Sequence, residues 1–98
     1  MGTPLHVAAR HDWVDMVTLL LDKGATLDAR NRELATPLSV AVWRGSLDTA
    51  RVLLARGADI EAKNARGRTP LFYAADGANV VNLVALLIEQ GADLNARD

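Results

Sequence analysis

The stretch TPLSVAVWRG, residues 36–45, begins with a tripeptide that the chain uses three times. Thr-Pro-Leu starts at residues 3, 36 and 69, so it recurs every 33 residues. Gly-Ala pairs start at residues 24, 57 and 91, at intervals of 33 and 34 residues. A fixed period of this length indicates a repeat architecture, in which neighbouring units stack to bury a shared core. The one extra residue of the third copy is expected between 76 and 79.

Each copy predicts two helices followed by an extended finger. Threonine accepts hydrogen bonds from free backbone N–H groups at a helix start, and proline suits the first helical position. A second helix is indicated by apolar residues at helical spacing, such as Leu47, Leu53 and Leu54 in the second copy. Gly57 follows that run, where a left-handed helix end favours glycine.

Composition narrows the function classes. The 98 residues suffice for one small domain, and half of them are hydrophobic. A net charge of −1 gives no reason to expect a nucleic-acid partner. No apolar run reaches the roughly 20 residues that a membrane span needs. The sequence has no cysteine and shows no signal peptide, so we expect an intracellular, cytoplasmic protein.

The repeated motifs resemble the ankyrin repeat family, whose signature is T-P-L-H-x-A. The matching segments are TPLHVA at 3–8, TPLSVA at 36–41 and TPLFYA at 69–74. The closing segments GATLDA at 24–29, GADIEA at 57–62 and GADLNA at 91–96 fit as well. The resemblance implies an all-α solenoid of stacked helix-turn-helix units with short β-hairpin-like fingers. It implies a single domain over 1–98, with repeats at approximately 1–30, 31–63 and 64–98.

Two residues depart from the family pattern. Asp12 stands where the family usually has glycine between the two helices of a repeat. Leu34 occupies the finger position that Gly67 holds in the next copy. Because a bulky residue is strained at positive φ, we expect the finger at 31–35 to adopt a different turn from the one at 64–68.

Catalytic motifs are missing from the sequence. It has no glycine-rich phosphate loop and no nucleophile elbow, and its carboxylates are spread over separate predicted helices. Of the two histidines, His6 is expected to be structural, with hydrogen bonds inside its Thr-Pro-Leu-His turn. His11 is expected at an exposed helix end. We therefore expect no enzymatic activity, no metal and no cofactor.

Positions that vary between the copies are free of the stacking requirement and are expected to face solvent. They cluster in the fingers and at the ends of the first helices, where the resemblance implies a concave surface that binds a protein partner. The candidate residues are Arg10, His11, Arg30, Arg32, Glu33, Trp43, Arg44, Lys63, Arg66, Arg68 and Asp76. The basic finger residues have a simpler interpretation as solvated charges balanced by nearby carboxylates.

The aromatic residues have separate expectations. Trp43 with Arg44 is the leading candidate for a partner contact, since both residue types are enriched in interface hot spots. Alternatively, Trp43 lies across neighbouring helices, shielded by an arginine through a cation–π contact. Trp13 and Phe72 are expected to pack locally, and Tyr73 falls at a core-directed position.

Neither end of the repeat array carries the polar outer face of a capping repeat. The chain is therefore expected either to come from a longer array or to self-associate through its ends. The leading function is a non-catalytic protein-binding module. The alternative is a structural or engineered scaffold segment with no dedicated ligand.

Overall fold

Each Thr-Pro step begins a helix in the computed structural model, which describes residues 2–74 and 80–91. Within these ranges the chain forms six helices and no strand, which confirms the all-α prediction. The first helices of the repeats are α1, Pro4–Arg10; α3, Pro37–Arg44; and α5, Pro70–Ala74. The second helices are α2, Val14–Asp22; α4, Leu47–Ala55; and α6, Val80–Glu89. The extra residue expected between 76 and 79 lies outside the described ranges.

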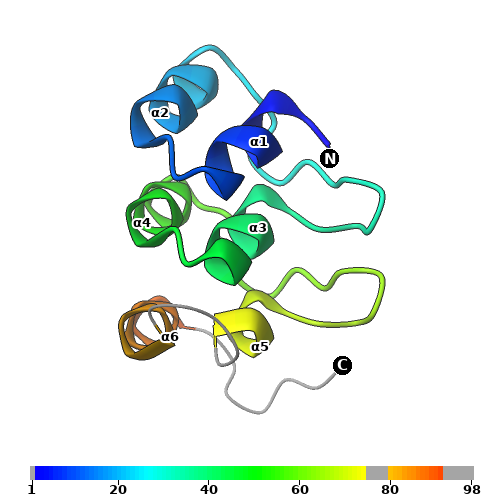
Figure 1. The fold of residues 1–98 in the computed structure, drawn as a ribbon, viewed down its shortest axis with the longest axis vertical. Coiled ribbons are helices and arrows are strands. Elements are labelled where there is room, and N and C mark those ends of the chain that lie inside the picture. The colour runs from blue at the N-terminus through cyan, green and yellow to red at the C-terminus, as the bar shows by residue number, and fades with distance from the viewer. Residues whose placement is uncertain (1, 75–79, 92–98) are drawn as a thin grey trace.

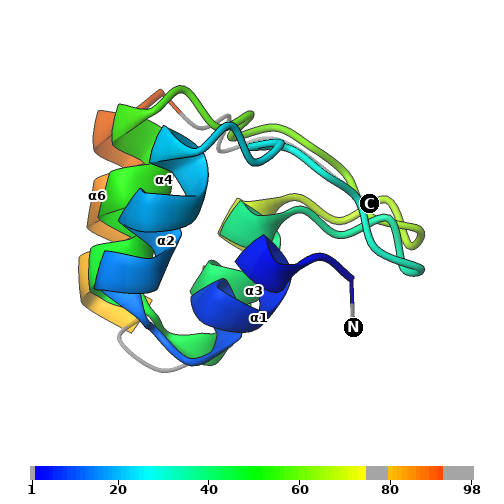
Figure 2. The same cartoon turned by 90° about the horizontal axis from the view of Figure 1, so that it is seen from above.

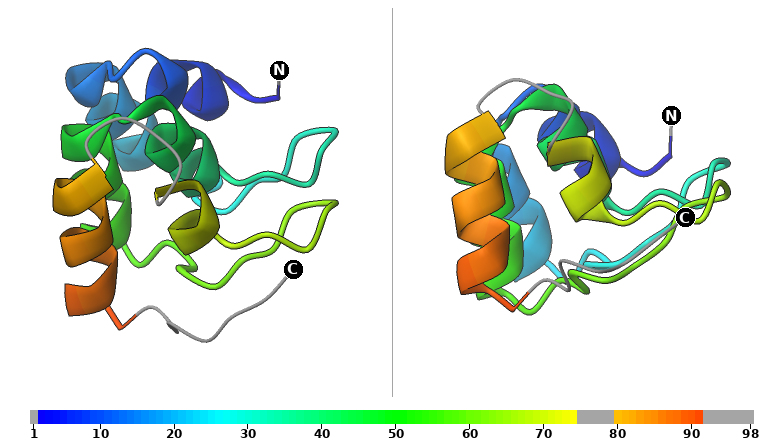
Figure 3. Two further views of the ribbon diagram at one scale, coloured as in Figure 1. Left: turned by 60° about the horizontal axis from the view of Figure 1, so that its bottom comes forward. Right: turned by 90° about the horizontal axis from the view of Figure 1, so that it is seen from below.

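The helices form two layers (Figure 1), which are clearest when the stack is seen end-on (Figure 2). One layer holds α1, α3 and α5, and the other holds α2, α4 and α6, with contacts between consecutive members of each. Two fingers, residues 30–35 and 63–68, project beyond the α1–α3–α5 layer and run side by side (Figure 3). This is the stacked arrangement that the 33-residue period predicts.

The core lies between the two layers and is built from leucines and small residues. Five leucines are at most 1% exposed: Leu5, Leu38, Leu53, Leu83 and Leu87. Alanines are buried in the first helices, at Ala8, Ala9, Ala41 and Ala74. Because an alanine side chain is short, consecutive first helices can approach closely, and close packing of this kind stabilises the stack.

His6 is structural, as the sequence predicts. Its side chain is 1% exposed, and its Nδ1 accepts hydrogen bonds from the backbone N–H of Thr3 at 3.2 Å and from the Thr3 hydroxyl at 2.9 Å. Its Nε2 lies 2.8 Å from the carbonyl oxygen of Ala35, and since a carbonyl can only accept, Nε2 donates. The ring therefore closes the start of α1 and ties the first repeat to the finger that follows it.

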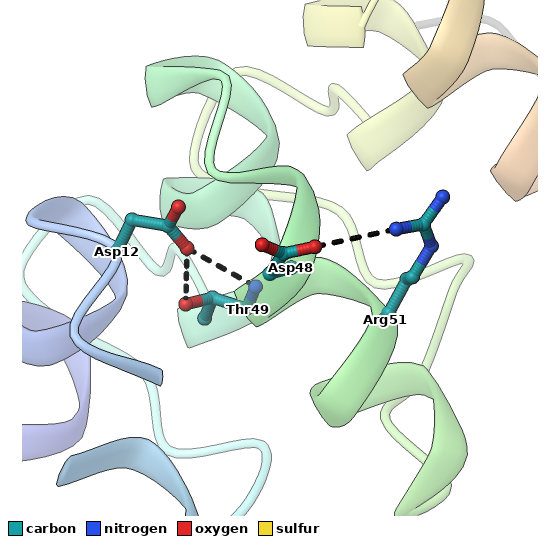
Figure 4. Close-up of polar contacts among 4 residues, drawn as sticks. All are labelled: Asp12, Asp48, Thr49 and Arg51. Atoms are coloured by element: carbon teal, nitrogen blue, oxygen red, sulfur yellow. Dashed lines mark hydrogen bonds and ion pairs between the residues drawn. The ribbon is translucent and has the colours of Figure 1, made fainter. Parts of the chain in front are cut away.

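Asp12 replaces glycine at a turn that requires a left-handed backbone, with φ at 56°. Aspartate tolerates this conformation better than most residues. Its carboxylate also accepts hydrogen bonds from the backbone N–H of Thr49 at 3.1 Å and from the Thr49 hydroxyl at 2.7 Å (Figure 4). Thr49 lies in the first turn of α4, and the N-cap residue Ser46 makes no side-chain capping hydrogen bond to this turn. Asp12 therefore caps a helix of the neighbouring repeat.

The prediction that the two fingers adopt different turns is wrong. Leu34 has φ at 59° and Gly67 has φ at 75°, so both occupy the left-handed region. The same backbone hydrogen bond precedes each of them, from Leu34 N–H to the Asn31 carbonyl and from Gly67 N–H to the Asn64 carbonyl, both at 2.9 Å.

The reason lies in the asparagine at the second position of each finger, Asn31 or Asn64. The Asn31 side-chain oxygen accepts from the N–H groups of Glu33 and Ala35, both at 3.0 Å. The Asn64 oxygen accepts in the same way from the N–H groups two and four residues ahead, at 2.9 and 3.1 Å. These hydrogen bonds fix the turn whichever residue stands at the left-handed position. Leu34 is 48% exposed, so its side chain meets no steric barrier from the core.

Leu34→Gly should raise the free energy of unfolding by about 0.5–1 kcal/mol, because glycine removes the left-handed strain while little buried surface is lost. Urea unfolding followed by circular dichroism measures the change. The matched control is Gly67→Ala, which introduces a side chain at the equivalent position and should lower stability by about 1 kcal/mol. A clear loss of stability in Leu34→Gly would contradict the assignment of strain to Leu34.

Candidate functional site

A groove of about 580 Å³ lies between the fingers and the first-helix layer. It draws on both fingers and on α1, α3 and α5, and its lining residues are Arg10, Asn31, Glu33, Ala35, Ser39, Val40, Trp43, Asn64, Ala65, Arg66, Arg68, Phe72 and Tyr73. Its volume lies within the range of roughly 300–1,000 Å³ that is usual for binding pockets. We call this feature the groove.

The floor of the groove is apolar and aromatic. Val40 and Tyr73 are 33 residues apart and hold the same position in α3 and α5, where both are partly buried against the core. Tyr73 accepts a hydrogen bond from the side-chain amide of Asn64, which joins α5 to the second finger. Phe72 packs edge to face on Tyr73, with ring centroids 5.3 Å apart. This local packing of Phe72 confirms the prediction, although 42% of the residue remains exposed and lines the groove.

Trp43 is the most exposed aromatic residue in the groove, with 56% of its surface accessible. It lies in the last turn of α3, next to Arg44, whose guanidinium carbon is 5.9 Å from the Trp43 ring centroid. That distance is at the outer limit of a cation–π contact. The local arginine therefore leaves most of the indole surface open to solvent. Trp43 shares the groove with Phe72, which is 42% exposed, and exposed apolar side chains grouped within a groove are typical of interaction sites.

Charged residues form the rim of the groove. Arg10 enters from the end of α1, Glu33 comes from the first finger, and Arg66 and Arg68 come from the second. The guanidinium carbon of Arg68 lies 4.4 Å from the ring centroid of Phe72, a close cation–π contact. Three arginines and one glutamate give the rim an excess of positive charge, although the net charge of the whole chain is −1.

Arg30 has a structural role in the fingers. Its guanidinium donates to the carbonyl oxygens of Leu34 at 2.9 Å and of Lys63 at 2.6 Å. A backbone hydrogen bond of 2.8 Å from Ala65 N–H to the Glu33 carbonyl joins the fingers directly. These contacts hold the two fingers, both of which line the groove, at a fixed spacing from each other.

The other predicted site residues lie outside the groove lining. Arg32 and Lys63 are exposed on the fingers, and Arg44 is exposed at the end of α3. His11 is exposed at the end of α1, as expected, and stacks on Trp13 with centroids 4.7 Å apart. Trp13 therefore packs locally, as predicted, while remaining 51% exposed. Asp76 lies outside the described residues.

Three polar residues that line the groove were not predicted from the sequence: Asn31, Ser39 and Asn64. Asparagines at 31 and 64 recur with the 33-residue period and so looked like part of the repeat pattern. Among the residues that the structure describes, no group of three histidine, cysteine or acidic side chains could hold a metal ion. None of the described helices is long and apolar enough to span a membrane.

Stacked helix pairs with projecting fingers and a groove beside them define a helical repeat protein. A family model described as ankyrin repeats in three copies matches residues 1–64, and a single ankyrin-repeat model matches residues 66–98. The chain belongs to the ankyrin repeat family, as the Thr-Pro-Leu motifs predicted. Ankyrin repeats are generally protein–protein interaction modules and are typically non-catalytic. A search of curated proteins found no match to this chain.

Proposed function

We propose that this chain binds a protein partner in the groove, with Trp43 as the central contact. The observation that carries the proposal is the open indole of Trp43, 56% exposed, above an apolar floor that includes Phe72 and Tyr73. Tryptophan and tyrosine are enriched among residues that dominate binding energy. The groove is held by hydrogen bonds between and within the fingers, so little conformational freedom is lost on binding.

The groove chemistry points to a partner segment that combines an apolar side chain with a carboxylate. The apolar side chain would pack on Trp43 and Phe72. A neighbouring aspartate or glutamate would meet Arg10 or Arg66 at the rim, where arginine can bind a carboxylate with two parallel hydrogen bonds. Glu33 disfavours a second carboxylate beside the first finger.

Selection of peptides from a displayed random library on the immobilised chain tests the proposal. We expect enrichment of peptides with an aliphatic or aromatic residue next to aspartate or glutamate. Their affinity should fall several-fold as salt rises from 0.05 to about 0.5 M, because screening weakens contacts between exposed charges. A scaffold segment with no dedicated ligand would yield no enrichment. Enriched peptides that bind Trp43→Ala as well as the original chain would also contradict the proposal.

A further inference from the structure

The two fingers carry equivalent asparagines, Asn31 and Asn64, whose side-chain amides have different surroundings. In both, the side-chain oxygen accepts from two backbone N–H groups of its own finger. The other terminal atom is therefore the NH₂ group, which can only donate. In the second finger this group donates to the hydroxyl of Tyr73, nine residues ahead. In the first finger the residue nine positions ahead is Val40, whose side chain has no acceptor.

The NH₂ group of Asn31 donates to no residue that the structure describes. Every buried side-chain nitrogen or oxygen in the described part of the chain has a hydrogen-bond partner, so this unbonded group is accessible to solvent. Asn31 lines the groove together with the apolar side chains of Val40 and Trp43. The groove therefore contains an amide donor that the fold does not use.

The orientation of the Asn31 amide is fixed by its oxygen. This oxygen accepts from the N–H groups of Glu33 and Ala35, both at 3.0 Å, and so holds the NH₂ group in one direction. A donor that is already oriented loses little entropy on binding. A partner that covered the NH₂ group without an acceptor would leave a buried donor unsatisfied, which is unfavourable. The group therefore favours a partner that places an acceptor over it.

The acceptor that fits this position is a neutral carbonyl oxygen. Glu33 lines the groove from the same finger, two residues further along, so a carboxylate acceptor would meet a like charge. The carbonyl oxygen of a main-chain amide, or of an asparagine or glutamine side chain, accepts without adding charge. The carboxylate of the partner is then left to Arg10 or Arg66 at the rim.

We infer that Asn31 is a specificity-determining residue of the groove, and that its NH₂ group donates to a neutral carbonyl oxygen of the protein partner. The inference rests on the proposed binding of a peptide segment in the groove, and it adds a polar contact to the apolar contact at Trp43. The equivalent amide of Asn64 has a structural role instead, because Tyr73 occupies it. The residue nine positions ahead thus decides which asparagine is left to a partner.

Asn31→Asp tests the inference with a library-selected acidic and apolar peptide, by isothermal titration calorimetry. Aspartate keeps the oxygen that holds the finger, so the urea unfolding midpoint should not fall, but it replaces the NH₂ group with a second acceptor. The peptide should bind about fivefold more weakly or worse. Asn64→Asp is the matched control, because it adds the same charge and can accept from the Tyr73 hydroxyl. It should change the affinity by less than about twofold at about 0.5 M salt, where the added charge is screened.

Changes in the peptide identify the oxygen that accepts. Replacing each main-chain amide in turn with an ester weakens its carbonyl as an acceptor, and replacing an asparagine or glutamine with alanine removes a side-chain carbonyl. One of these changes should weaken binding to the original chain about three- to tenfold and should have little effect on binding to Asn31→Asp. In nuclear magnetic resonance spectra, the side-chain amide protons of Asn31 should shift on binding more than those of Asn64.

The outcomes separate this inference from the proposed function. Unchanged binding to Asn31→Asp by peptides that still depend on Trp43 would overturn the inference and leave the proposed function intact. Equal losses in Asn31→Asp and Asn64→Asp would also overturn it, because they would reflect the added charge alone. Peptide changes whose effects are the same on the original chain and on Asn31→Asp would contradict the donor role. Failure to select any peptide would overturn both proposals.

Discussion

Leu53→Ala should lower the free energy of unfolding by about 2–5 kcal/mol, the range measured for truncating fully buried leucines. Leu53 is 0% exposed and lies in α4, the middle second helix, which contacts α2 on one side and α6 on the other. A cavity there removes packing from the core that the repeats share, and in repeat proteins stability is approximately the sum of each repeat's own stability and the contacts between neighbours. Because the free energy of unfolding of a small domain is only about 5–15 kcal/mol, this loss is a large fraction of the total stability.

Equilibrium urea unfolding, followed by circular dichroism at low protein concentration, measures this loss. Leu19→Ala is the matched control, because it makes the same chemical change in α2 at a residue that is 50% exposed. We expect the control to lose less than about 1 kcal/mol. Equal losses in the two variants would show that Leu53 does not carry the inter-repeat core assigned to it.

Asp12→Ala is the second variant with a large expected effect, a loss of about 2–3 kcal/mol. Thr49 is 0% exposed, so removing the carboxylate leaves its backbone N–H and its hydroxyl without their acceptor, at about 1–3 kcal/mol for an unsatisfied buried group. Alanine at φ of 56° adds left-handed strain. The start of α4 also loses a side-chain cap that comes from another repeat.

Three further variants separate these contributions by urea unfolding. Asp12→Asn keeps an acceptor oxygen and tolerates the left-handed backbone, so it should lose less than about 1 kcal/mol. Asp12→Gly relieves the strain but lacks the acceptor, and it should fall between asparagine and alanine. In a Thr49→Val background, Asp12→Ala should cost less than in the original chain, because the two side chains form one interaction. Additive losses would contradict the coupling.

Most of the fold could be predicted from the sequence because the 33-residue period determines where the helices begin and how the repeats stack. Thr3 and Thr36 accept from the backbone N–H groups three residues ahead, and proline follows each of them in the first helical position. His6 has the structural role that its place in the motif indicates, although its bond to Ala35 joins segments 29 residues apart. Contacts of that kind depend on how repeats stack, and local sequence gives no direct sign of them.

The motif alone could not predict the effects of Leu34 and Asp12, the two residues that depart from it, because those effects depend on hydrogen bonds to side-chain oxygens. Leu34 was expected to change the finger turn, but the Asn31 side chain holds the turn through two N–H groups. The same asparagine at position 64 shows that this device belongs to the repeat. Asp12 was recognisable as unusual, but its acceptor role depends on Thr49, 37 residues away.

The sequence predicted which positions belong to the candidate site, and the structure showed which of their side chains line the groove. Variation between copies marked Arg10, Glu33, Trp43, Arg66 and Arg68, which all line the groove. The same criterion marked Arg30, whose guanidinium is bonded to finger carbonyls. Phe72 and Tyr73 were interpreted as packing residues, and they also form the groove floor, because side chains at a layer surface can pack inward and remain accessible.

The two tryptophans offer the most direct test of the proposed binding site. They have similar exposure, 56% for Trp43 and 51% for Trp13, but only Trp43 lines the groove. The measurement is the affinity of a library-selected acidic and apolar peptide for Trp43→Ala and Trp13→Ala, by isothermal titration calorimetry. The account predicts a loss of about 30-fold or more for Trp43→Ala, equivalent to about 2 kcal/mol, and no change for Trp13→Ala. Equal affinities of the two folded variants, or a loss confined to Trp13→Ala, would contradict it.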